Sequence, residues 1–143
     1  STFVVPHTAD QDDTPALTAA LANFSTNSTI LFQKGTTYNI FTPIKFPTLT
    51  NVEVVIEGNL TYPTNITAIQ SQFLRLLSYD LDLFDFTGGT NITLQGSTDP
   101  NWGWIDGHGQ AWWNINQQTN RPHGWAFNHI TNGIIRNLKL WKV

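Results

Sequence analysis

A Thr-Asn dipeptide recurs along the chain, and each copy opens a run in which aliphatic residues alternate with polar ones. The copies begin at Thr50, Thr90 and Thr131, so their spacings are 40 and 41 residues. Such alternation is typical of a strand with one buried face. Recurrence at a near-constant interval indicates units that stack on one another rather than a closed barrel. The repeat predicts an all-β fold, a right-handed parallel β-helix; a sandwich of short strands would explain the alternation but not the interval.

Each run ends in the same three-residue step, an aliphatic residue, any residue, and then glycine or asparagine. The steps are Ile56-Glu57-Gly58, Leu94-Gln95-Gly96 and Ile135-Arg136-Asn137, with a further copy at Ile105-Asp106-Gly107. Glycine and asparagine tolerate a left-handed backbone better than other residues. We therefore expect each strand to bend at its end, so that successive coils place equivalent corners on one another.

The N-terminal part predicts a short amphipathic helix at about residues 13–23 that covers the end of the core. Asp13 or Thr14 can cap the first backbone N–H groups, and Pro15 suits the first turn. The first coils are expected from about residue 29 onward. An acidic cluster lies at Asp10, Asp12 and Asp13. A metal site is one interpretation of it, but helix capping is favoured, and no metal or cofactor is expected.

Composition favours a secreted glycoprotein. Hydrophobic residues make up 40% of the 143, enough for a packed core, whereas charged residues make up only 12%, which is low for a soluble surface. Five Asn-x-Ser/Thr sequons are candidate glycosylation sites: Asn23, Asn27, Asn59, Asn65 and Asn91. The sequence begins at Ser1 and contains no methionine, which fits a mature extracellular product.

The same composition argues against several classes of protein. The lack of cysteine removes disulfide scaffolds, thiol catalysis and cysteine zinc sites. A net charge of -3 without a basic run argues against a nucleic-acid partner. No apolar run is long enough to cross a bilayer, so no membrane partner is expected.

The carboxylates form no convincing catalytic pair. A glycosidase holds two of them about 5–10 Å apart across the bond that it cleaves. Asp106 lies in a corner step, where its side chain is expected to bind the backbone of the turn. Asp80 and Asp82 are interpreted as the exposed start of a strand, and Asp85 has the opposite parity. We therefore expect no catalytic residue within residues 1–143.

Residues 105–113, Ile-Asp-Gly-His-Gly-Gln-Ala-Trp-Trp, carry a resemblance to a known family. They resemble the Ile-Asp-Gly-x-Gly-x-x-Trp-Trp segment of polygalacturonases and their relatives, the pectin-cleaving enzymes of glycoside hydrolase family 28. The Asp-Asp-Thr segment at residues 12–14 is also similar to the start of many members. The resemblance implies a pectin-lyase-like β-helix. Residues 97–104 and 120–125 look most like the fungal exo-acting members, which implies inverting removal of terminal α-1,4-linked galacturonic acid from polygalacturonate.

The resemblance covers only about the first third of a family member. The family's catalytic segments, Asn-Thr-Asp, Asp-Asp, Gly-His-Gly and Arg-x-Lys, follow on later coils and have no counterpart here. Gly107-His108-Gly109 shares the letters of one of them but lies inside the earlier motif, so it is not matched to it. Residues 1–143 are therefore expected to form the N-terminal part of a single β-helix domain, with the catalytic residues after Val143.

Substrate-binding residues are predicted only weakly. Arg121 and His123 are the candidates, although for His108 and His123 ordinary hydrogen-bonding roles are favoured. Further basic residues that could meet a polyanion are Arg136, Lys139 and Lys142. The expected partners are a pectic polysaccharide and the rest of the chain, in a monomer when complete. A non-catalytic carbohydrate-binding or adhesive solenoid and a calcium-dependent pectate lyase remain alternatives.

The C-terminal strand pattern stops without a turn or cap. Solenoids require a capped end, because a bare coil exposes an apolar edge. Four side chains are expected to lie uncovered there: Ile134, Leu138, Leu140 and Trp141. The sequence is therefore interpreted as a piece of a longer protein.

Overall fold

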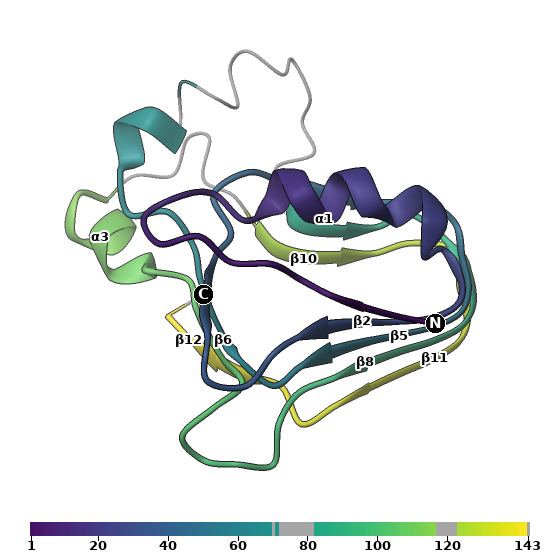
Figure 1. Cartoon of the computed structure of the whole chain (residues 1–143). Helices are drawn as coiled ribbons and strands as arrows, with labels where there is room; N and C mark the ends of the chain where they lie inside the picture. Colours follow the sequence, from purple (N-terminus) through teal and green to yellow (C-terminus); the bar gives the residue numbers. More distant parts are fainter. Residues whose placement is uncertain (70, 72–81, 117–122, 143) are drawn as a thin grey trace.

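A computed structural model describes residues 1–69, 71, 82–116 and 123–142, which wind into stacked coils with three parallel sheets along their sides (Figure 1). Sheet A has the order β1-β2-β5-β8-β11, sheet B the order β12-β9-β6-β3 and sheet C the order β10-β7-β4. All described strand pairs are parallel. The predicted parallel β-helix is confirmed, and the sandwich is excluded.

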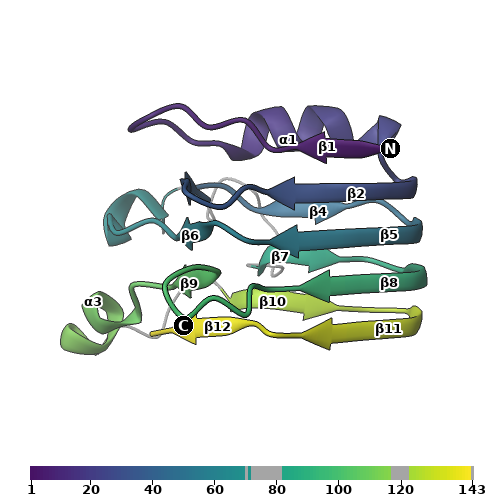
Figure 2. The same cartoon turned by 60° about the horizontal axis from the view of Figure 1, so that its bottom comes forward.

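Each complete coil contributes one strand to each sheet, and Figure 2 shows the coils lying one on another. The strands of sheet A are β1 (Thr2–Val4), β2 (Thr26–Phe32), β5 (Leu49–Ile56), β8 (Gly89–Gln95) and β11 (Ile130–Arg136). Those of sheet B are β3 (Thr37–Asn39), β6 (Asn59–Thr61), β9 (Trp104–Asp106) and β12 (Lys139–Trp141). Those of sheet C are β4 (Ile44–Phe46), β7 (Asp82–Phe86) and β10 (His123–Phe127).

The Thr-Asn repeat sets the register of sheet A. Thr50 pairs with Thr90, and Thr90 with Thr131, as the repeat predicts. Thr26 pairs with Thr50 and opens a further copy, which sequence analysis missed because this coil is shorter. The asparagine after each threonine is left-handed, with φ of 48° at Asn27, 54° at Asn51, 57° at Asn91 and 58° at Asn132. The repeated asparagine therefore satisfies a backbone requirement at the start of each strand.

Three of these asparagines form a side-chain ladder on the surface. The Nδ2 of Asn51 donates to Oδ1 of Asn27 at 2.8 Å, and the Nδ2 of Asn91 donates to Oδ1 of Asn51 at 3.0 Å. We call Asn27, Asn51 and Asn91 the asparagine ladder. It links three successive coils through their amide groups.

The glycines at the strand ends have a different role from the one predicted. Gly58 and Gly96 do not adopt the left-handed conformation; of the residues ending the sheet A strands, Asn137 does, with φ of 58°. A Cβ atom on Gly58 would lie 2.4 Å from the carbonyl oxygen of Gln33, and one on Gly96 would lie 2.0 Å from that of Asn137. Glycine is required there because the backbone of the neighbouring coil passes too close for a side chain.

The core contains a column of stacked phenylalanine rings contributed by sheet C. Phe46, Phe86 and Phe127 occupy equivalent positions on neighbouring strands. The ring centroids of Phe46 and Phe86 lie 4.4 Å apart with an interplanar angle of 4°, and those of Phe86 and Phe127 lie 5.1 Å apart with an angle of 6°. Aliphatic side chains from sheets A and B fill the rest of the interior, among them Ile30, Leu49, Val54, Ile56, Leu60, Leu94 and Ile105. Each large apolar side chain buried in this way contributes about 1.5–3 kcal/mol.

Helix α1 (Thr14–Ala20) and the 3₁₀ turn η1 (Leu21–Asn23) confirm the helix predicted at residues 13–23. Figure 2 shows α1 lying over the first coil, where Leu17 and Leu21 are buried. Asp13 makes no side-chain cap, contrary to the prediction. Its carboxylate instead accepts hydrogen bonds from the backbone N–H groups of Thr8 and Asn39. The carboxylate therefore fastens the segment before the helix to strand β3.

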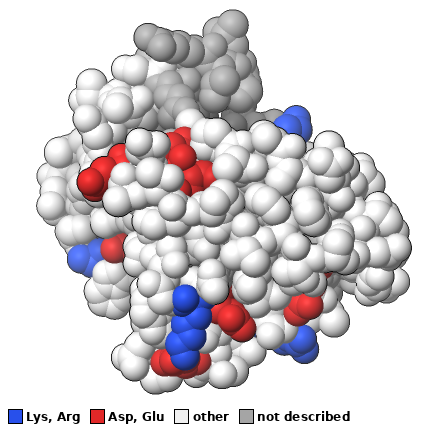
Figure 3. Space-filling view, viewed as in Figure 1, with Lys and Arg blue, Asp and Glu red and all other residues white. Residues whose placement is uncertain are grey.

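Charged side chains are sparse at the end of the molecule that α1 covers (Figure 3). Acidic side chains gather in one patch at the upper left of this view, and most of the basic groups lie beside acidic ones. Lys34 Nζ lies 2.7 Å from the Asp99 carboxylate, which raises the pKa of Lys34 and lowers that of Asp99.

None of the helices in the described part of the chain has the length and apolarity needed to cross a bilayer.

The last coil exposes most of the apolar side chains expected there. Ile134 is 52% exposed, Leu140 45% and Trp141 55%. Leu138 differs from the prediction, because it packs partly against the core. The exposed residues form an apolar edge at the end of the stack opposite α1.

Candidate functional site

The segment that follows β9 is held in a fixed turn. His108 is left-handed, with φ of 51°, and its backbone N–H donates to Oδ1 of Asp106 at 3.0 Å. The ring Nε2 of His108 lies 2.6 Å from the hydroxyl of Thr61. Asp106 and His108 therefore have the turn and hydrogen-bonding roles that the sequence predicts for them.

The two glycines of this turn contact the next coil. The N–H groups of Gly107 and Gly109 donate to the carbonyls of Trp141 and Lys142, at 2.9 and 2.7 Å. A Cβ atom on Gly109 would lie 2.5 Å from the Lys142 oxygen. Helix α3 (Gly109–Asn114) begins at this contact, so the turn fixes where its two tryptophans lie.

A cavity of about 700 Å³ lies between α3, the chain after β6 and the start of β10. We call it the aromatic cavity. Trp112 is buried and packs in a small cluster with Ile69, whereas Trp113 is 72% exposed. The lining residues are Tyr62, Pro63, Ile69, Gly107, Gly109, Gln110, Trp112, Trp113, His123, Gly124, Trp125 and Lys142. Exposed aromatic rings with a few polar groups are characteristic of ligand pockets.

Polar groups lie at one side of the aromatic cavity. The ring Nδ1 of His123 is 3.2 Å from Oδ1 of Asp82, and the hydroxyl of Tyr62 donates to the carbonyl of Gly124 at 3.1 Å. Burial raises the pKa of Tyr62, so its hydroxyl stays a donor. The His123 side chain is 73% exposed. His123 can therefore meet a ligand while Asp82 orients its ring.

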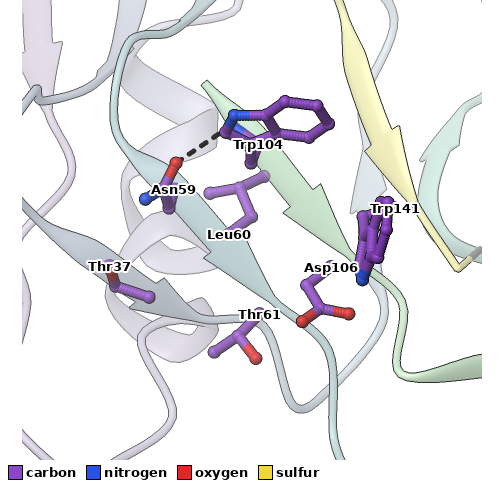
Figure 4. Close-up of a pocket in the computed structure, with 7 residues that line it drawn as sticks. All are labelled: Thr37, Asn59, Leu60, Thr61, Trp104, Asp106 and Trp141. Atoms are coloured by element: carbon purple, nitrogen blue, oxygen red, sulfur yellow. Dashed lines mark hydrogen bonds between the residues drawn. The ribbon is translucent and has the colours of Figure 1, made fainter. Parts of the chain in front are cut away.

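A second hollow, of about 450 Å³, lies on the outer face of sheet B (Figure 4). We call it the tryptophan hollow. Its walls include Trp104 and Trp141, and the carboxylate of Asp106 lies beside Trp141. The remaining lining residues are Thr37, Asn59, Leu60 and Thr61. Lys142 Nζ lies 5.6 Å from the centre of the Trp141 ring, within cation–π distance.

Three of the described carboxylates considered for catalysis have structural partners that can be named. Asp99 pairs with Lys34, and Asp106 accepts from the turn backbone. Asp82 is not an exposed strand start as predicted: its side chain is 13% exposed and contacts His123. Asp80 lies outside the described residues. Among the residues that the structure describes, no group of three or more histidine, aspartate or glutamate side chains could hold a metal ion.

The basic candidates separate into two groups. Arg136 donates to Oε1 of Gln95, and Lys139 donates to the carbonyls of Ser97 and Trp102, so both tie coils or loops together. Lys142 lines the aromatic cavity. Arg121 lies outside the described residues. Of the basic residues considered, Lys142 and His123 are brought to the same cavity.

The sequon asparagines differ in accessibility. Asn23, Asn27, Asn65 and Asn91 are exposed, and Asn59 is half-buried. The Nδ2 of Asn91, the atom that would carry a glycan, donates within the asparagine ladder. Asn27 enters that ladder only through its Oδ1.

Sequence analysis did not identify Tyr62 or Trp125 as cavity residues. Tyr62 lies just after β6, and Trp125 lies on β10, so the fold brings together segments far apart in the chain. The tryptophan pair at 112–113 was the detectable signal. The residues opposite it carry no local pattern that indicates a cavity.

Comparison with known proteins gives relatives for most of the chain. It is 42% identical over 126 residues to a probable exopolygalacturonase C of Aspergillus terreus, covering 84% of this chain and 28% of that protein. It is 44% identical over 117 residues to the probable exopolygalacturonase C of Neosartorya fischeri, covering 78% and 26%. The exopolygalacturonase rpg16 of Rhizopus delemar is 29% identical over 111 residues, covering 78% and 25%. The chain thus spans about a quarter of the length of these relatives.

A solved structure shares the fold. The endo-xylogalacturonan hydrolase of Aspergillus tubingensis matches with a TM-score of 0.68 over 98% of this chain and 43% of that one, at 21% identity. This likeness confirms the right-handed parallel β-helix. No protein-family model matches the chain. The motif at residues 105–113, the fold and these relatives make the chain similar to the N-terminal part of the polygalacturonase-like glycoside hydrolases of family 28, with fungal exopolygalacturonases among its relatives.

Proposed function

We propose that this chain is the N-terminal portion of a secreted pectin-degrading glycoside hydrolase. The proposed reaction is inverting exo-hydrolysis of polygalacturonate, which releases α-1,4-linked galacturonic acid from the chain end. The observation that carries the proposal is the 42% identity over 126 residues to an exopolygalacturonase C. The parallel β-helix agrees with it, because the matching solved structure, an endo-xylogalacturonan hydrolase, has the same fold.

The proposed contribution of residues 1–143 is scaffold and substrate binding rather than bond cleavage. Asp82, Asp99 and Asp106 each hold a structural contact to another residue. An inverting hydrolase needs one carboxylic acid and one carboxylate on opposite sides of the glycosidic bond. The catalytic pair is therefore proposed to lie after Val143, in the remainder of the same β-helix domain.

The aromatic cavity is the proposed place where sugar units contact this part of the enzyme. The exposed ring of Trp113 offers a flat apolar surface to a sugar face. Lys142 and His123 offer positive charge or hydrogen-bond donors to a uronate carboxylate. Arg121 stays a candidate by prediction from the sequence. No cofactor and no nucleic-acid or membrane partner are part of the proposal.

Secretion and glycosylation belong to the same proposal. Asn23, Asn27 and Asn65 are exposed acceptors, and Asn59 is a half-buried one. Asn91 is the least favourable acceptor, because its Nδ2 is used in the asparagine ladder. The complete protein is proposed to act extracellularly as a monomer.

Product analysis of the complete protein tests the reaction. Purified enzyme is incubated with polygalacturonate, with and without a calcium chelator, and the products are separated by anion-exchange chromatography. We expect free galacturonic acid from the earliest time points, no unsaturated sugars and no effect of chelation. Early oligosaccharides would indicate endo action, and unsaturated products that require calcium would indicate a lyase. Binding of the polymer without reducing-sugar release would indicate the carbohydrate-binding solenoid.

A matched pair of variants tests the cavity. Trp113→Ala removes the exposed ring, and Trp104→Ala removes a ring outside the cavity. Loss of a ground-state contact raises KM while leaving kcat unchanged. We therefore expect a several-fold rise in KM for Trp113→Ala and none for Trp104→Ala. Equal effects of the two changes would argue against substrate binding in this cavity.

A further inference from the structure

The tryptophan hollow is lined by one of the sequon asparagines. Asn59 lies at the start of β6 and is the neighbour of Trp104 on β9. Trp141, on β12, lies beside the Asp106 carboxylate one strand further along sheet B (Figure 4). An acceptor for a glycan and two tryptophans therefore share a hollow of about 450 Å³.

The side-chain amide of Asn59 is held in one orientation. Its Oδ1 accepts a hydrogen bond of 3.0 Å from the backbone N–H of Trp104. In the described part of the chain no acceptor binds its Nδ2. A substituted amide is planar and trans, so a sugar carbon on Nδ2 lies on the same side of the C–N bond as Oδ1. Because Oδ1 faces Trp104, a sugar on Asn59 starts on the side of that tryptophan.

The spacing of the strands suits a short chain of sugars. Neighbouring strands lie about 4.8 Å apart, so Trp104 is one strand spacing from Asn59. Trp141 pairs with Asp106, so it lies two strand spacings across and two residues along the sheet from Asn59, which is roughly 12 Å. The two-sugar core of an N-linked glycan spans this distance. Trp104 is 36% exposed, and its ring and that of Trp141 border the hollow. Apolar rings that border one hollow are covered favourably by a ligand with an apolar face.

Asp106 gives the hollow an acceptor that suits neutral sugars. Its carboxylate accepts one bond from the His108 N–H, and a carboxylate can accept several. Sugar hydroxyl and acetamido groups are donors for it, whereas a galacturonate carboxylate would be repelled by Asp106 and attracted only by Lys142, which lies over the Trp141 ring. A tethered ligand also binds at a high effective concentration, because the second contact is intramolecular.

We propose that an N-linked glycan on Asn59 occupies the tryptophan hollow, with its first sugar over Trp104, its second against Trp141 and a hydroxyl donated to Asp106. This inference rests on the proposed secretion, because the glycan is added in that pathway. It assigns the outer face of sheet B to the protein's own glycan rather than to substrate.

The experiment uses the complete protein, secreted from a fungal host. Peptide mass mapping gives the occupancy of each sequon and the rate at which N-bromosuccinimide oxidises each tryptophan. We compare wild type with Asn59→Gln and with Asn23→Gln, which removes an exposed sequon elsewhere. We expect Asn59 to be occupied, and Trp104 and Trp141 to oxidise several-fold faster in Asn59→Gln but at the wild-type rate in Asn23→Gln.

Trimming of the wild-type glycan to one sugar gives a test without any substitution. We expect Trp104 to stay protected and Trp141 to become reactive. An unoccupied Asn59, or equal oxidation rates with and without its glycan, would overturn the inference. Protection of the Asn59→Gln tryptophans by added galacturonate oligosaccharides would overturn it in favour of substrate. Hydrolysis of polygalacturonate by the same preparations tests the proposed function independently, and Asn59→Gln is expected to keep that activity.

Discussion

Replacement of Gly96 by alanine tests the close stacking of coils directly. The added Cβ would lie 2.0 Å from the carbonyl oxygen of Asn137 and 2.7 Å from its carbonyl carbon. Non-bonded heavy atoms rest at about 3.5–4.0 Å, so the neighbouring backbone has to move by roughly 1 Å or more. Both atoms belong to the backbone of Asn137, in the corner between β11 and β12, so no flexible side chain can absorb the change.

The expected loss of stability has two parts. Overpacking in a well-packed interior costs about 1–3 kcal/mol. The movement also weakens the 2.9 Å hydrogen bond from the Gly96 N–H to the Arg136 carbonyl, and such a bond contributes about 0.5–1.5 kcal/mol. We therefore expect Gly96→Ala to lower the free energy of unfolding by about 2–4 kcal/mol.

Gly124→Ala is the matched control. A Cβ there would meet its nearest atom, the Tyr62 hydroxyl, at 3.6 Å, an ordinary contact, and Gly124 is not left-handed. Its free energy of unfolding should change by no more than about 0.5 kcal/mol. Urea unfolding of the complete protein, followed by tryptophan fluorescence, measures both variants. A Gly96→Ala variant no less stable than Gly124→Ala would refute the close approach of the two coils.

Three further predictions concern the core, a buried tyrosine and the isolated chain. Phe86→Ala should cost about 3–5 kcal/mol by urea unfolding, because its buried ring stacks on both sides; a loss below about 1 kcal/mol would contradict the ring column. Burial raises the pKa of Tyr62 above the value of about 10 that a tyrosine has in the unfolded chain. The contribution of Tyr62 to the free energy of unfolding is therefore complete below about pH 10 and is lost as the pH rises above it. Tyr62→Phe should therefore reduce the fall in the free energy of unfolding at alkaline pH. Residues 1–143 expressed alone should aggregate in light scattering and release no sugar from polygalacturonate, because their last coil is apolar and exposed; a soluble, active monomer would contradict this.

The fold was largely predictable because its signals are local and repeated. The threonines of the repeat specify the register of sheet A, and Pro15 with the apolar pattern after it specifies the helix. The copy at Thr26 escaped detection because the first coil is shorter than the later ones. Repetition therefore predicts stacking well where the coils are of equal length.

The site was less predictable because its contacts are long-range. Asp13 or Thr14 was expected to cap the helix, but Asp13 accepts from the backbone of Asn39 on strand β3, and Asp12 accepts from the Thr14 N–H instead. Lys139 was considered as a basic residue that could meet a polyanion, but it donates to loop carbonyls near β9. The tryptophans at 112–113 were recognisable, whereas Tyr62 on the other side of the cavity was not. These contacts depend on which segments the coils bring together, and the sequence pattern carries no information on that.

The measurement that bears most directly on the central claim is the activity of the complete protein without three of its described carboxylates, one on β7, one on β9 and one in the loop between β8 and β9. Asp82→Asn, Asp99→Asn and Asp106→Asn are assayed separately for galacturonic acid release from polygalacturonate, with folding checked by circular dichroism. Loss of a general acid or base lowers the rate by about 10²–10⁴-fold. If the catalytic pair lies after Val143, each folded variant keeps its kcat within about tenfold of wild type. A folded variant that loses a thousandfold or more would show that residues 1–143 contain a catalytic carboxylate.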